Sequence, residues 1–157
     1  MPSTVYLETT IVSYLTGRSS RDLIVAAHQQ LTQEWWDQHR LAFDLYISQL
    51  VIQEASAGDP MVPKRRLVAL EGIPLLALTE DAVALARALT NDGPVPAKSA
   101  ADALHIAVAA INGMEFLLTW NCKHIANAIT RSSIEAICRV RGYEPPIICT
   151  PEELLGG

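Results

Sequence analysis

Two polar side chains follow directly on short apolar segments of the kind that form buried strands. Glu8 comes immediately after residues 4–7 (Thr-Val-Tyr-Leu), and Asn121 stands two residues after residues 116–119 (Phe-Leu-Leu-Thr). In an open α/β sheet, ligands bind beyond the carboxyl ends of the strands. Both side chains are therefore candidates for contacts with a metal ion or a substrate.

Two further carboxylates belong to helical patterns that are otherwise apolar. At 100° per residue, Glu54 projects into the apolar arc of a helix predicted over residues 49–57, and Asp102 opens the most apolar helix of the chain, which continues through residues 103–108. A buried carboxylate without a partner is costly, so such a residue usually has an ion-pair partner or a cation.

Carboxylates that converge repel one another, and a divalent cation is the usual reason for a protein to tolerate them together. The candidate ligands are hard oxygens without clustered His or Cys, which favours Mg²⁺ or Mn²⁺ over zinc.

Each of the four residues also has a purely structural interpretation. Glu8 suits a helix N-terminus, and Asn121 suits the first position of the turn that follows it. Asp102 is the third residue after Ser99 and fits a capping box, while Glu54 could pair with a basic residue of the next helix, Lys64 or Arg65.

The elements that must position these residues alternate between strands and helices. Strands are predicted over residues 4–7, 43–48, 73–78, 116–119 and 147–149. Helices are predicted over residues 10–15, 22–40, 49–57, 63–70, 79–89 and 132–141, with a further apolar helix after Ser99. This alternation predicts an α/β domain with a mainly parallel central sheet flanked by helices on both faces. We expect one domain over residues 1–157.

Composition excludes several classes of protein. Half of the 157 residues are apolar, which is not a disordered composition. The 17 acidic and 12 basic residues argue against a protein that coats nucleic acid through its net charge. The three cysteines form no CxxC pair, and we find neither a secretory signal nor an apolar segment long enough to span a bilayer. We therefore expect a cytoplasmic protein with no membrane association.

Four stretches of the chain resemble the four motifs of PIN domains, in their order and with their spacing. They are residues 5–15 (VYLETTIVSYL), 49–55 (QLVIQEA), 102–107 (DALHIA) and 117–121 (LLTWN). The chain is most similar to the small single-domain PIN proteins that act as VapC-type toxins of toxin–antitoxin pairs. The resemblance implies a PIN-like fold whose acidic residues gather at the carboxyl ends of the strands, and a metal-dependent nuclease that cuts RNA.

The resemblance carries the four metal-site positions of the family onto Glu8, Glu54, Asp102 and Asn121. Two of them depart from the family pattern, which usually has Asp at the first position and often at the fourth. We expect the three carboxylates to hold one Mg²⁺ or Mn²⁺, with Asn121 orienting a water or supporting a weaker second ion.

Two kinds of residue are expected to support this site. Thr9 and Thr119 are placed to hydrogen-bond the carboxylates and hold them in position. Basic residues could bind RNA phosphates beside the metal, although a solvated helix face explains them equally well. They are Arg18, Lys64, Arg65 and Arg66.

Three other residues are open to more than one interpretation. His105 lies three residues after Asp102, where core packing is favoured over a role as general acid or ligand. Trp35 and Trp36 lie on the long second helix, which in VapC-like proteins helps to form the homodimer or to receive the antitoxin, but burial against the sheet is equally compatible with the pattern.

The function that these patterns predict is a Mg²⁺- or Mn²⁺-dependent endoribonuclease, the toxin partner of an antitoxin protein, acting as a homodimer. The alternative is a catalytically weakened PIN-like module that binds RNA or a protein, because Glu8 and Asn121 both depart from the usual set. A phosphatase or phosphotransfer domain is disfavoured, because it needs an Asp nucleophile where this chain has Glu8.

Overall fold

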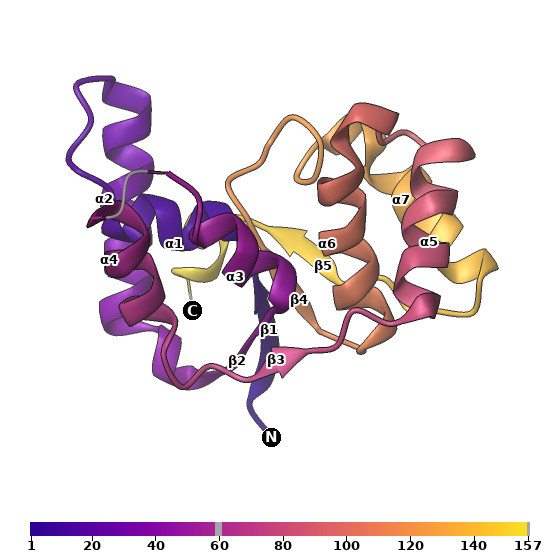
Figure 1. Cartoon of the computed structure of the whole chain (residues 1–157), viewed down its shortest axis with the longest axis horizontal. Helices are drawn as coiled ribbons and strands as arrows, with labels where there is room; N and C mark the ends of the chain where they lie inside the picture. Colours follow the sequence, from indigo (N-terminus) through magenta and orange to yellow (C-terminus); the bar gives the residue numbers. More distant parts are fainter. Residues whose placement is uncertain (59–60, 157) are drawn as a thin grey trace.

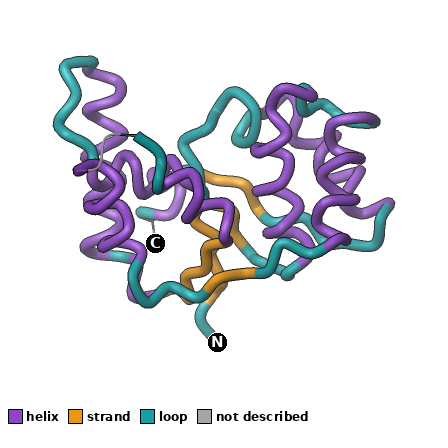
Figure 2. The backbone as a smooth tube through the Cα atoms, viewed as in Figure 1, coloured by secondary structure: helices purple, strands orange, loops and turns teal. Residues whose placement is uncertain are grey.

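Five parallel strands run through the centre of the molecule (Figures 1 and 2). The computed structural model describes residues 1–58 and 61–156. The strands are β1 (Ser3–Leu7), β2 (Phe43–Ser48), β3 (Leu75–Leu76), β4 (Phe116–Leu118) and β5 (Ile147–Cys149). They lie in the order β3-β2-β1-β4-β5. The predicted α/β class with a parallel sheet is confirmed.

Helices cover the sheet on both sides. They are α1 (Thr9–Thr16), α2 (Leu23–Gln38), α3 (Gln49–Ala55), α4 (Met61–Leu70), α5 (Glu80–Asn91), α6 (Ala100–Ile111) and α7 (Ala128–Val140). In Figure 1, α1, α2 and α4 lie to one side of the strands and α5, α6 and α7 to the other. The described residues also form three short 3-10 turns. Two lie in connections, η1 (Arg40–Ala42) and η2 (Ala97–Ser99), and η3 (Pro151–Leu154) follows β5.

The core forms where the most apolar segments of the sequence meet. Val5, Tyr6 and Leu7 of β1 are fully buried, as expected for the central strand of a sheet covered on both faces. Most of α6 after its first turn is buried as well, because this helix is apolar around most of its circumference. Trp35 of α2 is also buried, so this ring belongs to the core and does not offer a surface to a partner.

Local capping decides where several elements begin. Thr79 accepts a hydrogen bond from the backbone N–H of Ala82 and caps α5, as predicted. The predicted helix over residues 132–141 instead starts at Ala128, because the Asn127 side chain accepts from the N–H of Ile129 and caps it earlier. Ser99 precedes α6 but makes no side-chain capping bond, so the capping box expected for Asp102 does not form.

The third strand is much shorter than the predicted residues 73–78. Only Leu75 and Leu76 pair with β2, at the edge of the sheet. Pro74 has no N–H to donate to a ladder, and Thr79 caps the next helix only three residues after the strand. The edge position leaves Leu75 exposed.

The strand order creates a switch point between β1 and β4. From β1 the chain adds β2 and then β3 on one side, and it crosses back to place β4 on the other side of β1. Ligand sites in open α/β sheets lie beyond the strand ends at such a point. The register pairs Leu7 with Leu118, so Glu8 and Thr119 leave the two strands side by side.

No helix within the described ranges is long and apolar enough to cross a lipid bilayer.

Candidate functional site

Glu8 is held in place by three donors at the switch point. The residue is 4% exposed, and its side chain caps α1, with Oε2 accepting from the backbone N–H of Thr10 at 3.1 Å. Its other oxygen, Oε1, accepts from the hydroxyls of Thr10 and Thr119, each at 2.6 Å. The structural interpretation of Glu8 as a helix cap is therefore confirmed, and the same geometry fixes the carboxylate at the end of β1.

The two hydroxyls that bind Glu8 are themselves oriented by the backbone. The N–H of Trp120 donates to Thr10 Oγ1 at 2.8 Å, and the N–H of Asn121 donates to Thr119 Oγ1 at 2.9 Å. Because each hydroxyl oxygen already accepts a hydrogen bond, its proton is free to point at Glu8. The loop after β4 thus helps to position a carboxylate that follows β1.

Glu54 lies on α3 with its side chain 35% exposed. Its Oε1 accepts from the hydroxyl of Thr9 at 2.6 Å and lies 2.6 Å from Nε2 of His105. Among the described residues, His105 is thus a hydrogen-bond partner of Glu54, where the structural interpretation offered Lys64 or Arg65 as a partner. Thr9 and Thr119, which we expected to hydrogen-bond the carboxylates, contact Glu54 and Glu8 respectively.

Opposing effects act on the Glu54 carboxyl. Burial by itself raises its pKa, because the charged form loses water. The hydrogen bond from His105, the electrostatic attraction of its imidazole and the hydrogen bond from Thr9 all lower the pKa. The lowering effects prevail, so the pKa of Glu54 lies below its usual value of 4.5 and the group is a carboxylate at neutral pH.

His105 is fully buried on α6, and it connects the site to the core of the sheet. Its Nδ1 lies 2.7 Å from the hydroxyl of Tyr6, which in turn lies 2.7 Å from Oγ of Ser48. Burial and the charges of Glu8 and Glu54 raise the pKa of Tyr6 far above its usual value, so its hydroxyl keeps its proton. The favoured interpretation of His105 as a core residue accounts for its burial but not for its contact with Glu54.

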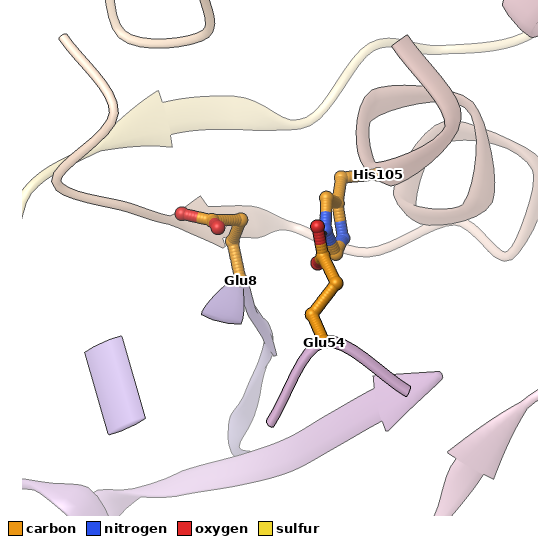
Figure 3. Close-up of side chains that lie close together, drawn as sticks. All are labelled: Glu8, Glu54 and His105. Atoms are coloured by element: carbon orange, nitrogen blue, oxygen red, sulfur yellow. The ribbon is translucent and has the colours of Figure 1, made fainter. Parts of the chain in front are cut away.

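Glu8, Glu54 and His105 together form a cluster in which one potential ligand atom from each lies within 4.8 Å of the others. Figure 3 shows the Glu54 carboxylate against the His105 ring, with Glu8 to one side of the pair. Oε2 of Glu8 accepts one hydrogen bond, and both hydrogen bonds described for the Glu54 side chain go to its Oε1. Each carboxylate therefore keeps lone pairs that could bind a cation. Two such carboxylates beside an imidazole are a ligand set that fits a divalent cation.

Asp102 and Asn121 lie at the border of this cluster. Asp102 is half-buried in the first turn of α6, one turn before His105, and within residues 1–58 and 61–156 it joins no such group of three ligands. Oδ1 of Asn121 accepts from the backbone N–H of His124 at 3.0 Å, so this side chain caps a turn, as its structural interpretation predicted. The metal roles expected for both residues stay predictions.

The predicted phosphate-binding residues lie on the side of the molecule that carries α3. Lys64 and Arg65 are exposed on α4, and Arg66 is half-buried, with a long hydrogen bond of 3.4 Å to the carbonyl of Ala57. Helix α4 packs against two helices of the site. They are α1, which begins directly after Glu8, and α3, which carries Glu54. Arg18 is exposed just after α1.

Three residues of the site were missed by sequence reasoning: Tyr6, Thr10 and Ser48. Tyr6 carries a polar tip in the middle of a buried strand, and such a hydroxyl usually finds a partner. Ser48 ends a buried strand, and Thr10 follows a helix cap. These signals indicate that each residue has a hydrogen-bond partner, but they do not identify that partner.

The site and the sheet define a class of protein: an α/β protein of PIN-like fold with a carboxylate and histidine cluster at the switch point of its sheet. No family model matches the chain, and no curated protein matches its sequence. Among solved structures, a chain of VapBC2 from Rickettsia felis has a similar fold. That complex was determined bound to a DNA fragment from its promoter. The match covers 94% of this chain and 98% of that chain, with a TM-score of 0.59 and 14% sequence identity. This likeness shows the fold.

Proposed function

We propose that this protein is a metal-dependent endoribonuclease that hydrolyses RNA phosphodiester bonds. The observation that carries the proposal is the convergence of Glu8, Glu54 and His105 at the switch point of a PIN-like sheet. Carboxylates brought together at this edge repel one another, and a divalent cation relieves that repulsion. The four sequence motifs that resemble those of PIN domains point to the same chemistry.

Glu8 and Glu54 would hold Mg²⁺ or Mn²⁺, with Asp102 and Asn121 contributing from the border of the cluster. When bound, such an ion activates a water and stabilises negative charge on the phosphoryl oxygens. Hydrogen bonds from the hydroxyls of Thr10 and Thr119 fix the orientation of the Glu8 carboxylate.

Substrate binding would use the positive charge of α4. Lys64 and Arg65 are exposed there, beside the helix that carries Glu54. Contacts from such side chains to phosphates position an RNA strand without reading its sequence. Arg18 would extend the same surface from the end of α1.

We further propose that the protein is the toxin of a toxin–antitoxin pair in the cytoplasm, paired with an antitoxin protein and acting as a homodimer. The support is the similarity of fold to a chain of VapBC2, together with the resemblance of the motifs to VapC-type toxins. Co-expression with the protein encoded next to it should relieve any growth arrest that this chain causes alone.

Cleavage of RNA tests the enzymatic proposal. The purified protein should cleave single-stranded RNA with Mn²⁺ or Mg²⁺ and should lose this activity in EDTA. Glu54→Gln and Asp102→Asn should each lower the rate at least about 100-fold, since both remove a charged ligand while keeping the shape of the side chain. Glu71→Gln, at an exposed position after α4, is the matched control and should cleave at the rate of the parent. Cleavage that survives EDTA, or an Asp102→Asn variant as fast as the parent, would refute the assignment.

A second candidate function is a PIN-like module that binds RNA without cutting it. Two observations favour it: the Glu8 carboxylate already accepts three hydrogen bonds, and Asn121 caps a turn. Retained RNA binding by the parent with no cleavage at any Mn²⁺ or Mg²⁺ concentration would select this function over the enzymatic one.

A further inference from the structure

We propose that Ser48, Tyr6 and His105 form a directed hydrogen-bond relay that positions Glu54 for its cation, so that His105 is a positioning residue and not a ligand. The inference rests on the proposed function, because it assigns a task within the same metal site. It is carried by three contacts of 2.6 to 2.7 Å between groups that come from β1, β2, α3 and α6.

The direction of the relay follows from which groups can donate. Glu54 is a carboxylate and only accepts, so Nε2 of His105 must carry the hydrogen that points to it at 2.6 Å. In the neutral imidazole, the other nitrogen, Nδ1, is then an acceptor. Its neighbour at 2.7 Å is the hydroxyl of Tyr6, which therefore donates to it. The Tyr6 oxygen is left to accept from Ser48 at 2.7 Å.

Every proton in this chain of contacts points toward Glu54. Ser48 donates to Tyr6, Tyr6 to His105 and His105 to Glu54, and Tyr6, Ser48 and His105 are all buried. Aligned hydrogen bonds polarise one another and hold their members in a single orientation. The relay thus selects one tautomer of His105 and fixes the ring against the carboxylate.

The relay occupies one oxygen of Glu54 and leaves the other available. Oε1 accepts from both His105 and Thr9, which uses its two lone pairs. The oxygen turned toward a cation is then Oε2. One oxygen of Glu54 thus faces the buried His105, and the other is left for a cation, which agrees with a fully buried histidine beside a partly buried carboxylate side chain.

Coordination of the cation by His105 itself is the competing assignment. It would require Nε2 to give up its hydrogen and its contact with Glu54, since a metal ligand must present a lone pair. The Tyr6 hydroxyl, which is buried, would still occupy Nδ1. The two assignments differ in which of the two ring nitrogens carries the hydrogen, which can be measured.

The tautomer of His105 in the metal-free protein is the first test. Long-range ¹H–¹⁵N correlation at pH 7, with the His105 signals assigned by their loss in His105→Gln, should show a protonated Nε2 and an unprotonated Nδ1. Tyr6→Phe, which keeps the packing of the ring but removes the donor to Nδ1, should leave Nε2 protonated and shift the ¹⁵N signal of Nδ1, which loses its hydrogen bond. A ring protonated at Nδ1 in the parent, or an Nδ1 signal that is the same in Tyr6→Phe as in the parent, would overturn the relay. This measurement needs no metal and no RNA.

Affinity for Mn²⁺ in the absence of RNA is the second test. By calorimetry, Tyr6→Phe should weaken binding about 10-fold, the lower end of the effect expected when a partner that orients a ligand is removed. Tyr143→Phe, a half-buried tyrosine beyond α7, is the matched control and should bind as the parent does. His105→Gln, which retains an amide N–H, should bind more tightly than His105→Leu. Equal affinity of Tyr6→Phe and the parent would contradict the proposal.

Magnetic resonance of the bound Mn²⁺ separates the two roles of His105. Electron spin-echo modulation should show no directly coordinated ¹⁴N in the parent, whereas a coordinated imidazole would give a strong coupling and overturn the proposal. Absence of RNA cleavage by the parent, with the tautomer and the Mn²⁺ affinities as predicted, would refute the proposed nuclease and leave the relay standing.

Discussion

At the scale of single residues, Glu8 shows how a helix cap and a candidate metal ligand are combined in one side chain. Its carboxylate satisfies the backbone N–H of Thr10 and also accepts from the hydroxyls of Thr10 and Thr119. The same carboxylate thus caps the first turn of α1 and lies at the switch point of the sheet.

Glu54 makes the free energy of unfolding depend on pH in the metal-free protein. Its pKa in the folded state lies below the usual 4.5, so the unfolded state binds the proton more readily as the solution becomes acidic. The stability that this group contributes is complete above pH 4.5, and it is lost as the pH falls through the lower folded-state value.

Urea unfolding of the parent and of Glu54→Gln in EDTA measures this contribution. We expect the parent to lose stability relative to the variant as the pH is lowered from 6 to 3, because only the parent must protonate a stabilised carboxylate. Parallel pH profiles for the two proteins would show that His105 and Thr9 do not stabilise the charged form.

At the scale of elements, the site depends on segments that meet only in the folded sheet. β1 delivers Glu8 and β4 delivers Thr119 to adjacent positions, because their register pairs the last residues of the two strands. Helix α3 begins at the end of β2 and carries Glu54 to the same edge. Helix α4 then packs against α1 and α3 and brings positive charge to this side of the molecule.

A triple variant in which Lys64, Arg65 and Arg66 are all changed to Ala should bind single-stranded RNA more weakly, and its binding should be less sensitive to salt. If the three side chains contact three phosphates, the slope of log K against log [salt] should fall by about 2, since each contact with a single strand contributes about 0.7. Filter binding in EDTA across a range of salt concentrations measures the slope without cleavage.

A matched control removes the same charge elsewhere. Arg87, Lys98 and Arg141 are exposed on or next to α5, α6 and α7, the group of helices on the other side of the sheet in Figure 1. Their joint replacement with Ala should change the slope little. Equal effects of the two triple variants would mean that only net charge matters and that α4 has no special part.

At the scale of the whole molecule, a cation at this site would join segments that are far apart in the sequence. Glu8, Glu54 and His105 come from the end of β1, from α3 and from α6. A ligand that binds only when these elements are together stabilises the folded state against the unfolded chain. Metal binding is therefore expected to appear in global stability as well as in activity.

Addition of Mn²⁺ at about 100 times its Kd should stabilise the parent by about 2.7 kcal/mol. For a chain of this size, that corresponds to a rise in Tm of roughly 5 to 10 °C. Glu54→Gln should show a much smaller rise in thermal unfolding followed by circular dichroism, while Glu71→Gln should behave as the parent does. A rise in Tm of Glu54→Gln as large as that of the parent would place the cation elsewhere.

Much of the fold could be predicted from the sequence because its signals are local. The strands over residues 43–48 and 147–149 and the cap at Thr79 are confirmed, since apolar patterning and helix capping act within a few neighbouring residues. The strand predicted over residues 73–78 is wrong in extent, because pairing at a sheet edge depends on the neighbouring strand and not only on apolar side chains.

The sequence by itself determined the order of strands and helices and the placement of Glu8 at a strand end, because these follow from short-range periodicity. Only the tertiary structure decided which groups meet. Glu54 and His105 are 51 residues apart, and Tyr6 and His105 are 99 apart, so their contacts depend on where α6 packs against the sheet and which face it turns inward. The same packing buries His105 between Tyr6 and Glu54, where the cost of an unpaired polar group selects one arrangement of donors and acceptors.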